Sequence, residues 1–199
     1  MRIPQPYYQQ PSVLEIAPDL IGKKLFSNAG GKLTSGIITE TEAYAGVTDR
    51  GSHAYGGRRT KRTETMFMPG GYAYVYLCYG IHALFNIVTG PADDPLAVLI
   101  RAVKPADGLE IMQKRRNTKG KNISNGPGKL TQALGITTDM NGISLTDDQI
   151  WIEEFMEIPK EQIQSGPRIG IDYAGADAQL PYRFWINNNS ITNSLGNTQ

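Results

Sequence analysis

Two glutamates with one residue between them are the first candidates for chemistry, in the segment Thr39-Glu40-Thr41-Glu42-Ala43-Tyr44. Residues 32–44 are rich in Thr and Ile, which favours a strand. Because side chains alternate along a strand, Glu40, Glu42 and Tyr44 share one face. Two carboxylates this close repel each other unless one is buried or paired, and a carboxylate tuned in this way can serve as a general base. The alternative is an edge strand with two solvated glutamates, although Tyr44 places an aromatic ring beside the carboxylate.

A basic loop follows this strand. Residues 45–65 are polar and Gly-rich, with no acid between Asp49 and Glu64. The cations of the loop are Arg50, Arg58, Arg59, Lys61 and Arg62, with His53 among them. Arg and Lys neutralise the phosphates of nucleic acids and displace their counterions, so this loop is a candidate phosphate-binding segment. The alternatives are a solvated charge run and a hydrogen-bonded structural role for His53.

Tyrosines are concentrated in the next segment, YAYVYLCY, which has the composition of a strand. Tyr72, Tyr74 and Tyr76 share one face of this strand, whereas Tyr79 falls at a tight turn with Gly80. Core packing is the ordinary role of such a stripe. Tyrosine is also a good stacking surface for a nucleobase, and an aromatic side chain at a hairpin tip can act as a wedge between base steps.

Arg101 interrupts an otherwise apolar run, LAVLIRAV, at residues 96–103. A buried arginine is unfavourable unless it meets a carboxylate. Glu42 is a plausible partner, and such a pair could fix a water molecule between its members. A purely structural salt bridge is the competing interpretation.

Composition limits the class of protein. A chain of 199 residues with 40% hydrophobic and 20% charged residues can form one core, which excludes wholesale disorder. The lone Cys78 leaves no internal disulfide and no multi-cysteine zinc cluster. No apolar run reaches the roughly 20 residues of a membrane helix, and residues 1–13 do not read as a secretory signal. We therefore expect a cytoplasmic protein without a membrane partner.

The formal net charge of +1 hides an uneven distribution. Residues 1–49 carry four Lys and Arg against five Asp and Glu, a net charge of −1. Residues 50–129 carry thirteen against five, a net charge of +8, and residues 130–199 carry three against nine, a net charge of −6. A basic segment of this kind predicts a nucleic-acid face better than the total charge does.

The expected elements form one α+β domain with an antiparallel β-sheet, since most turns are too short for crossover helices. Residues 1–11 are expected to be a flexible N-terminal arm, residues 12–188 the domain, and residues 189–199 a flexible tail. Helices are predicted near residues 12–16, 107–116 and 128–134. Strands are predicted at residues 24–27, 32–44, 72–79, 82–88, 96–103, 149–152, 168–171 and 182–187.

Taken together, these motifs resemble a known family. The block ITETEAYAGVTDRGSHAYGGRRTKRTETMFMPGGYAYVYLCYGIHALFNIV is similar to the mammalian-type alkyladenine (3-methyladenine) DNA glycosylases, which also occur in bacteria. The resemblance continues through VLIRAVKPADGLEIM, SNGPGKLTQALGI and GPRIGIDYAG, and it runs from about Pro18 to Ile186. It implies a curved antiparallel sheet with flanking helices and a protruding β-hairpin, in an enzyme that removes damaged purines from double-stranded DNA without metal or cofactor.

The resemblance also implies roles by position. Glu42 would activate water, and Arg101 and the Ile169 carbonyl would help to hold it. The side chains around the flipped base would be Tyr44, His53 and Tyr76, with Asn86 biasing against normal guanine. Tyr79 would be the wedge, while Arg58, Lys129 and neighbours such as Arg59 would contact phosphates. The absence of Lys from the pocket motifs favours water rather than an amine as the nucleophile.

The chain departs from the family at the hairpin, where His82 and Ile81 follow the wedge, and the Pro91–Pro95 loop is longer. Two alternative functions remain at this point. One is a non-catalytic binder of damaged DNA, which the intact Glu42 and Arg101 oppose. The other is a nucleoside hydrolase for small substrates, which would need neither the basic segment nor the wedge. We expect a monomeric repair enzyme, nucleoid-associated in a bacterium, for alkylated and deaminated purines.

Overall fold

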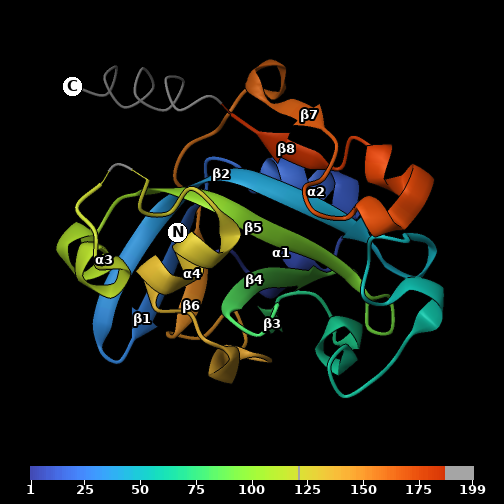
Figure 1. Ribbon diagram of the computed structural model, residues 1–199, viewed down its shortest axis with the longest axis horizontal. Helices are drawn as coiled ribbons and strands as arrows, with labels where there is room; N and C mark the ends of the chain where they lie inside the picture. Colours follow the sequence, from blue (N-terminus) through green and yellow to red (C-terminus); the bar gives the residue numbers. More distant parts are fainter. Residues whose placement is uncertain (121, 187–199) are drawn as a thin grey trace.

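A curved antiparallel sheet organises the computed structural model of the chain, which describes residues 1–120 and 122–186 (Figure 1). Six strands follow the order β3-β4-β5-β2-β1-β6, and β8 pairs with both β2 and β7. The strands are β1 (Lys24–Ala29), β2 (Lys32–Ala45), β3 (Ala73–Cys78), β4 (His82–Thr89), β5 (Leu96–Pro105), β6 (Ile150–Glu153), β7 (Gln164–Gly166) and β8 (Arg183–Trp185). The α+β class and the antiparallel sheet expected from the sequence are confirmed.

The long strand β2 changes neighbours along its length. Residues 32–37 pair with β1, whereas Glu40, Thr41 and Glu42 pair with β8, and β5 lies along the other edge from residue 36 onwards. The register between β2 and β5 shifts twice around Glu40, so that Arg101 has no direct partner in the ladder. Such bulges redirect side chains. The two glutamates therefore lie in the interior of the sheet, which excludes the solvated edge strand.

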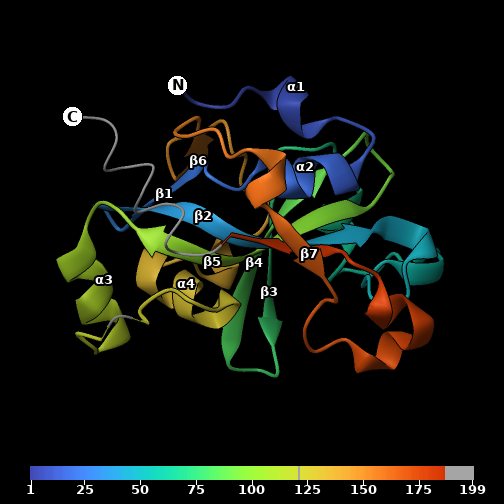
Figure 2. The same ribbon diagram turned by 90° about the horizontal axis from the view of Figure 1, so that it is seen from above.

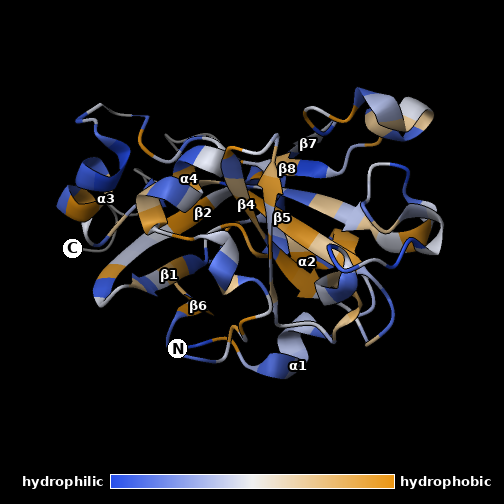
Figure 3. Cartoon of the chain, turned by 60° about the horizontal axis from the view of Figure 1, so that its bottom comes forward, coloured by the Kyte–Doolittle hydropathy of each residue, from blue (hydrophilic) through white to orange (hydrophobic). Residues whose placement is uncertain are grey.

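Helices cover the sheet and complete the core. They are α1 (Gln5–Tyr8), α2 (Val13–Asp19), α3 (Leu109–Arg116) and α4 (Pro127–Leu134). Helix α4 begins with Pro127 at a position where proline is favoured, and it ends at Gly135 with φ +71°, a left-handed conformation that suits glycine. Hydrophobic residues predominate in β4 and β5, whereas much of α3 is hydrophilic (Figure 3). Among the described residues, no helix is long and apolar enough to cross a bilayer.

The β3–β4 hairpin projects from one side of the molecule, and α1 and α2 lie on the opposite side (Figure 2). Its turn consists of Tyr79 with φ +50° and Gly80 with φ +73°, and the Ile81 amide donates to the Cys78 carbonyl at 3.1 Å. Two consecutive positive φ angles are the signature of a type I′ hairpin turn. The protruding hairpin expected from the family resemblance is present.

Two segments differ from the sequence-based expectations. The strand predicted at residues 168–171 is wrong: the chain bends there with Gly170 at φ +77°, and the paired segment is β7, further back. Residues 1–11 also do not form the expected loose arm, because Ile3 and Tyr8 are buried in the core and the Ile3 amide donates to the Ile152 carbonyl. The tail expected at residues 189–199 lies outside the described residues.

Candidate active site

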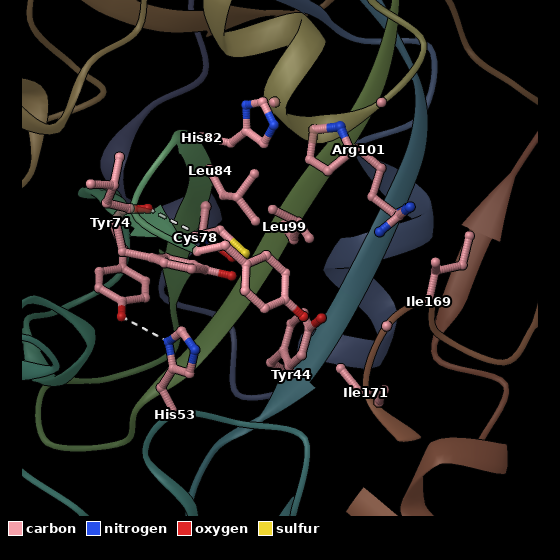
Figure 4. Close-up of a pocket in the computed structure, with 18 of the residues that line it drawn as sticks. Tyr44, His53, Tyr74, Cys78, His82, Leu84, Leu99, Arg101, Ile169 and Ile171 are labelled. Atoms are coloured by element: carbon pink, nitrogen blue, oxygen red, sulfur yellow. Dashed lines mark hydrogen bonds between the residues drawn. The ribbon is translucent and has the colours of Figure 1, made fainter. Parts of the chain in front are cut away.

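A cavity of about 1000 Å³ opens between the β3–β4 hairpin, β5, the loop after β2 and the segment at residues 169–173 (Figure 4). It gathers side chains from parts of the sequence that are far apart. Eight of the residues predicted from the sequence line it: Tyr44, His53, Tyr76, Tyr79, Asn86, Arg101, Lys129 and Ile169. Three others, Glu42, Arg58 and Arg59, do not line it.

Glu42 lies behind the cavity wall and is fully buried. Its Oε1 accepts a hydrogen bond from the Ile169 amide at 2.8 Å and lies 3.2 Å from Arg101 Nη1. Its Oε2 accepts a hydrogen bond from the Tyr44 hydroxyl at 2.9 Å. Burial raises the pKa of the Glu42 carboxyl, against the opposing effects of Arg101, the Ile169 amide and the Tyr44 hydroxyl, while Glu40 raises it further. A carboxylate of raised pKa is suited to accept a proton near neutral pH.

Arg101 pairs with both glutamates of the β2 motif. Its Nε donates to Glu40 Oε1 at 2.8 Å, and its Nη1 faces Glu42. The predicted pairing of Arg101 with Glu42 is therefore present, and Glu40 is an additional partner. The shared contact also confirms that both glutamates point to the same side of β2.

The segment that carries Ile169 is anchored by a buried ion pair that sequence reasoning missed. Arg168 Nη1 lies 2.5 Å from Asp49 Oδ2 and donates to the Ala43 carbonyl at 3.0 Å, and its guanidinium lies 4.8 Å from the centre of the Tyr44 ring. The Arg168 side chain is 0% exposed and that of Asp49 is 2% exposed. The Ile169 amide contacts Glu42, whereas the expected role of the Ile169 carbonyl in holding a water molecule stays a prediction. The only sequence signal for the ion pair was an isolated Arg168 in the stretch GPRIGI.

Aromatic rings form one wall of the cavity. The His53 and Tyr76 rings meet edge to face at 4.6 Å, and Tyr76 lies 5.4 Å from Tyr74. His53 Nδ1 and the Tyr74 hydroxyl are hydrogen-bonded at 2.9 Å (Figure 4). Burial, together with the charges of Arg62 and Arg58, lowers the pKa of His53 to about 4. The imidazole is therefore neutral at physiological pH, and the wall presents uncharged rings.

Asn86 stands at the floor of this wall, 4% exposed, and its Nδ2 donates to the Tyr74 carbonyl at 3.1 Å. Arg62, which was noted in the sequence only as part of the basic loop, lines the cavity with its guanidinium 5.1 Å from the centre of the Tyr76 ring. This contact shows that the aromatic wall can face a cation.

The predicted wedge and phosphate-binding residues fall into two groups. Tyr79 at the hairpin tip is 90% exposed, and Arg58 and Lys129 are also exposed around the cavity. Arg59 instead forms ion pairs with Glu64 at 2.7 Å and Asp93 at 2.6 Å, which brace the loop. Its guanidinium is thus already engaged by two carboxylates.

A buried carboxylate behind an aromatic cavity, with cations around the mouth, has the chemistry to receive an aromatic ring attached to a polyanion. Comparisons with known proteins identify the family. The model of the methylpurine-DNA glycosylase (MPG) family matches residues 7–190, and the chain belongs to this family. The resemblance drawn from the sequence is thereby confirmed.

Similar proteins occur in Bacillus species. The chain is 44% identical over 200 residues to a protein of Bacillus cytotoxicus, with 95% of this chain and 98% of the relative covered. It is 46% identical over 199 residues to a protein of Bacillus cereus and 45% identical over 199 residues to one of Bacillus thuringiensis, with 93% of this chain and 95% of each relative covered. All three carry the name "Putative 3-methyladenine DNA glycosylase".

Proposed function

We propose that the protein is a monofunctional DNA glycosylase that flips alkylated purines, such as 3-methyladenine, out of duplex DNA and hydrolyses their N-glycosidic bond. The family membership and the names of the Bacillus relatives support the glycosylase activity. The observation that carries the mechanism is Glu42, an ionisable group buried beside the cavity and fixed by three contacts. The product would be an abasic site, the first intermediate of base excision repair.

Base flipping accounts for the shape of the site. A purine stacked inside the double helix cannot enter a cavity in the protein, so the nucleotide must leave the stack. The exposed Tyr79 in the hairpin turn would fill the space that the flipped nucleotide leaves. Exposed cations such as Arg58 and Lys129 would contact the DNA phosphates that flank the flipped nucleotide. The protein would bind the duplex as a single molecule.

Selectivity for alkylated bases would come from the aromatic wall. Alkylation at a ring nitrogen makes the purine cationic, and a cation over Tyr44 or Tyr76 is attracted by the ring quadrupole. Asn86 at the floor would crowd the exocyclic amino group of guanine. Hypoxanthine, a deaminated purine, is neutral and lacks that amino group, so we expect it to be a slower substrate.

The chemical step would be a hydrolysis that needs no cofactor. The oxygen of a water molecule would attack C1′ of the flipped nucleotide, and Glu42 would accept the proton as the bond between C1′ and the purine nitrogen breaks. The electron pair of that bond neutralises the positive charge of the alkylated base, which leaves as a free neutral purine. Arg101 and the segment at Ile169 would keep the carboxylate and water in line.

A base-release assay tests this function. The purified protein should release free base from duplexes with 3-methyladenine, more slowly from duplexes with hypoxanthine, and not from the free nucleoside. Glu42→Gln should slow release by at least about 10²-fold while keeping affinity for abasic-site DNA, whereas Glu161→Gln, at an exposed position, should behave like the wild type. Efficient cleavage of the free nucleoside would instead favour a nucleoside hydrolase, and damaged-duplex binding without release would favour a non-catalytic binder.

A further inference from the structure

Four side chains of alternating charge form a continuous chain from Glu42 to the surface of the sheet. Glu42 faces Arg101 at 3.2 Å, Arg101 faces Glu40 at 2.8 Å, and Glu40 faces Arg183 at 3.2 Å. Exposure increases along the chain, from 0% for the Glu42 side chain and 11% for Arg101 to 21% for Glu40 and 23% for Arg183. Only Arg101 among these four lines the cavity.

The pairing of β2 with β5 and β8 brings these four side chains together. The register shifts between β2 and β5 place Arg101 between the two glutamates, and β8 brings Arg183 directly opposite Glu42 in the ladder. Arg183 also donates from Nε to the Pro167 carbonyl at 3.0 Å, two residues before the amide that holds Glu42. Its guanidinium lies 4.2 Å from the centre of the Trp185 ring. Arg183 is therefore held by three contacts, with Glu40, the Pro167 carbonyl and the Trp185 ring.

The charges in this chain act on Glu42 in opposite directions. Glu40 repels the Glu42 carboxylate and raises its pKa, and it also shares the cation that stabilises Glu42. Arg183 offsets the charge of Glu40, so it favours ionised Glu42 through Glu40. The other titratable and charged groups that face Glu42 are Tyr44 on β2, Arg101 on β5 and Arg168 before the Ile169 amide.

We propose that Glu40 and Arg183 are positioning residues, which fix the Arg101 guanidinium against Glu42 and set the pH at which Glu42 becomes available as the base. This inference rests on the proposed function, because it concerns the ionisation of Glu42, the carboxylate that the proposed function uses as the base. Neither residue needs to touch the DNA base or the reacting atoms. Their effect is transmitted through Arg101, which has one carboxylate on each side.

The inference makes opposite predictions for two substitutions. Glu40→Gln removes the repulsion and leaves Arg101 to Glu42 alone, so the acid limb of the pH–rate profile should move to lower pH. Arg183→Gln leaves Glu40 unbalanced, which increases its repulsion of Glu42 and its pull on Arg101, so the limb should move to higher pH. The double variant should behave like Glu40→Gln, because Arg183 acts through Glu40. The maximal rate of Glu40→Gln should fall by about tenfold, since Arg101 loses one of its two carboxylates.

The measurements are single-turnover base release from pH 4 to 9 and a 13C NMR titration of the Glu42 carboxyl in the free protein. The matched control is Glu154→Gln. Like Glu40, Glu154 shares its cation with a second carboxylate: Lys23 pairs with both Glu154 and Asp19, outside the site. This control should leave both titrations unchanged. If Glu40→Gln and Arg183→Gln shift Glu42 in the same direction, or lower the rate at every pH without any shift, the inference is overturned. The NMR titration decides this even if the wild type releases no base, an outcome that would overturn the proposed function separately.

Discussion

Replacing Glu42 by Gln should change base release and the stability of the fold in opposite directions, so the two effects can be measured separately. Glutamine has the shape of the protonated carboxyl, so its oxygen can still accept from the Ile169 amide and face Arg101. Its NH2 group takes the place of Oε2, and the Tyr44 hydroxyl then accepts a hydrogen bond instead of donating one. Glutamine cannot accept a proton from water. Loss of a general base lowers the rate typically by 10²- to 10⁴-fold. We therefore expect the rate of base release from a 3-methyladenine duplex to fall by at least about 10²-fold.

The same substitution should make the fold more stable at neutral pH. The pKa of Glu42 is higher in the folded chain than in the unfolded chain, where it is about 4.3, so the folded chain holds the proton more tightly. Ionised Glu42 therefore destabilises the fold above its folded pKa, and this effect disappears below about pH 4. Each pKa unit corresponds to about 1.4 kcal/mol, or about 3–5 °C in the melting temperature of a chain of this length.

Arg101 makes this gain possible. Removing one partner of a buried ion pair normally destabilises a protein, because it leaves the other charge unpaired. Here Arg101 retains Glu40 at 2.8 Å after Glu42 becomes neutral. Thermal unfolding of wild type and Glu42→Gln from pH 4 to 8 checks this reasoning. The difference in melting temperature should shrink as the pH falls, and a variant that is less stable at every pH would refute it, just as normal base release would refute the catalytic role.

Four further predictions concern the rest of the site. Tyr79→Ala should weaken damaged-duplex binding more than release from a pre-extruded base, and it should leave the melting temperature unchanged because this side chain is 90% exposed. Arg62→Gln should raise the pKa of His53 above about 4 in an NMR titration and increase the preference for cationic over neutral bases, since a positive charge at the cavity wall is lost. Asp49→Asn should lower the free energy of unfolding by about 3–5 kcal/mol in urea titrations, because Arg168 stays buried without its carboxylate. In binding titrations, the logarithm of duplex affinity should fall with the logarithm of salt concentration by about 0.9 per phosphate contact.

The sheet could be predicted from the sequence wherever alternation and turns are strong. The strand pair that meets at Tyr79 and Gly80 and the apolar strand β5 carry such local signals. The segment at residues 168–171 has a strand-like composition, yet its conformation is decided by distant contacts, since Arg168 is drawn to Asp49 and the Ile169 amide to Glu42. A pairing between residues more than one hundred positions apart leaves no local trace in one sequence.

The candidate site was predictable to the extent that its residues stand out in their surroundings. Arg101 stands out as a charged residue inside an apolar run, and Glu40 and Glu42 stand out as two acids on one strand face. The pairing of Arg101 with Glu42 could therefore be predicted from the sequence. The roles of Tyr74 and Arg62 in the cavity, and of Arg183 in the charge chain, depend on how the loop and β8 are folded onto the sheet. These roles could not be predicted, because they depend on contacts between segments that are far apart in the sequence.

The basic segment shows why a count of charges along the sequence overstates a DNA face. Some of its cations already form ion pairs within the protein. Arg101 pairs with the two β2 glutamates, and Arg59 pairs with Glu64 and Asp93. Arg115 is likewise turned inward, donating to the carbonyls of Ala29 and Ala133. Among the described residues, exposed cations that could meet phosphates include Arg58 on the loop and Lys129 at the start of α4. The salt dependence of binding should therefore correspond to fewer contacts than the thirteen Lys and Arg of residues 50–129 suggest. A slope that matched all thirteen cations would mean that the internal ion pairs open when DNA binds.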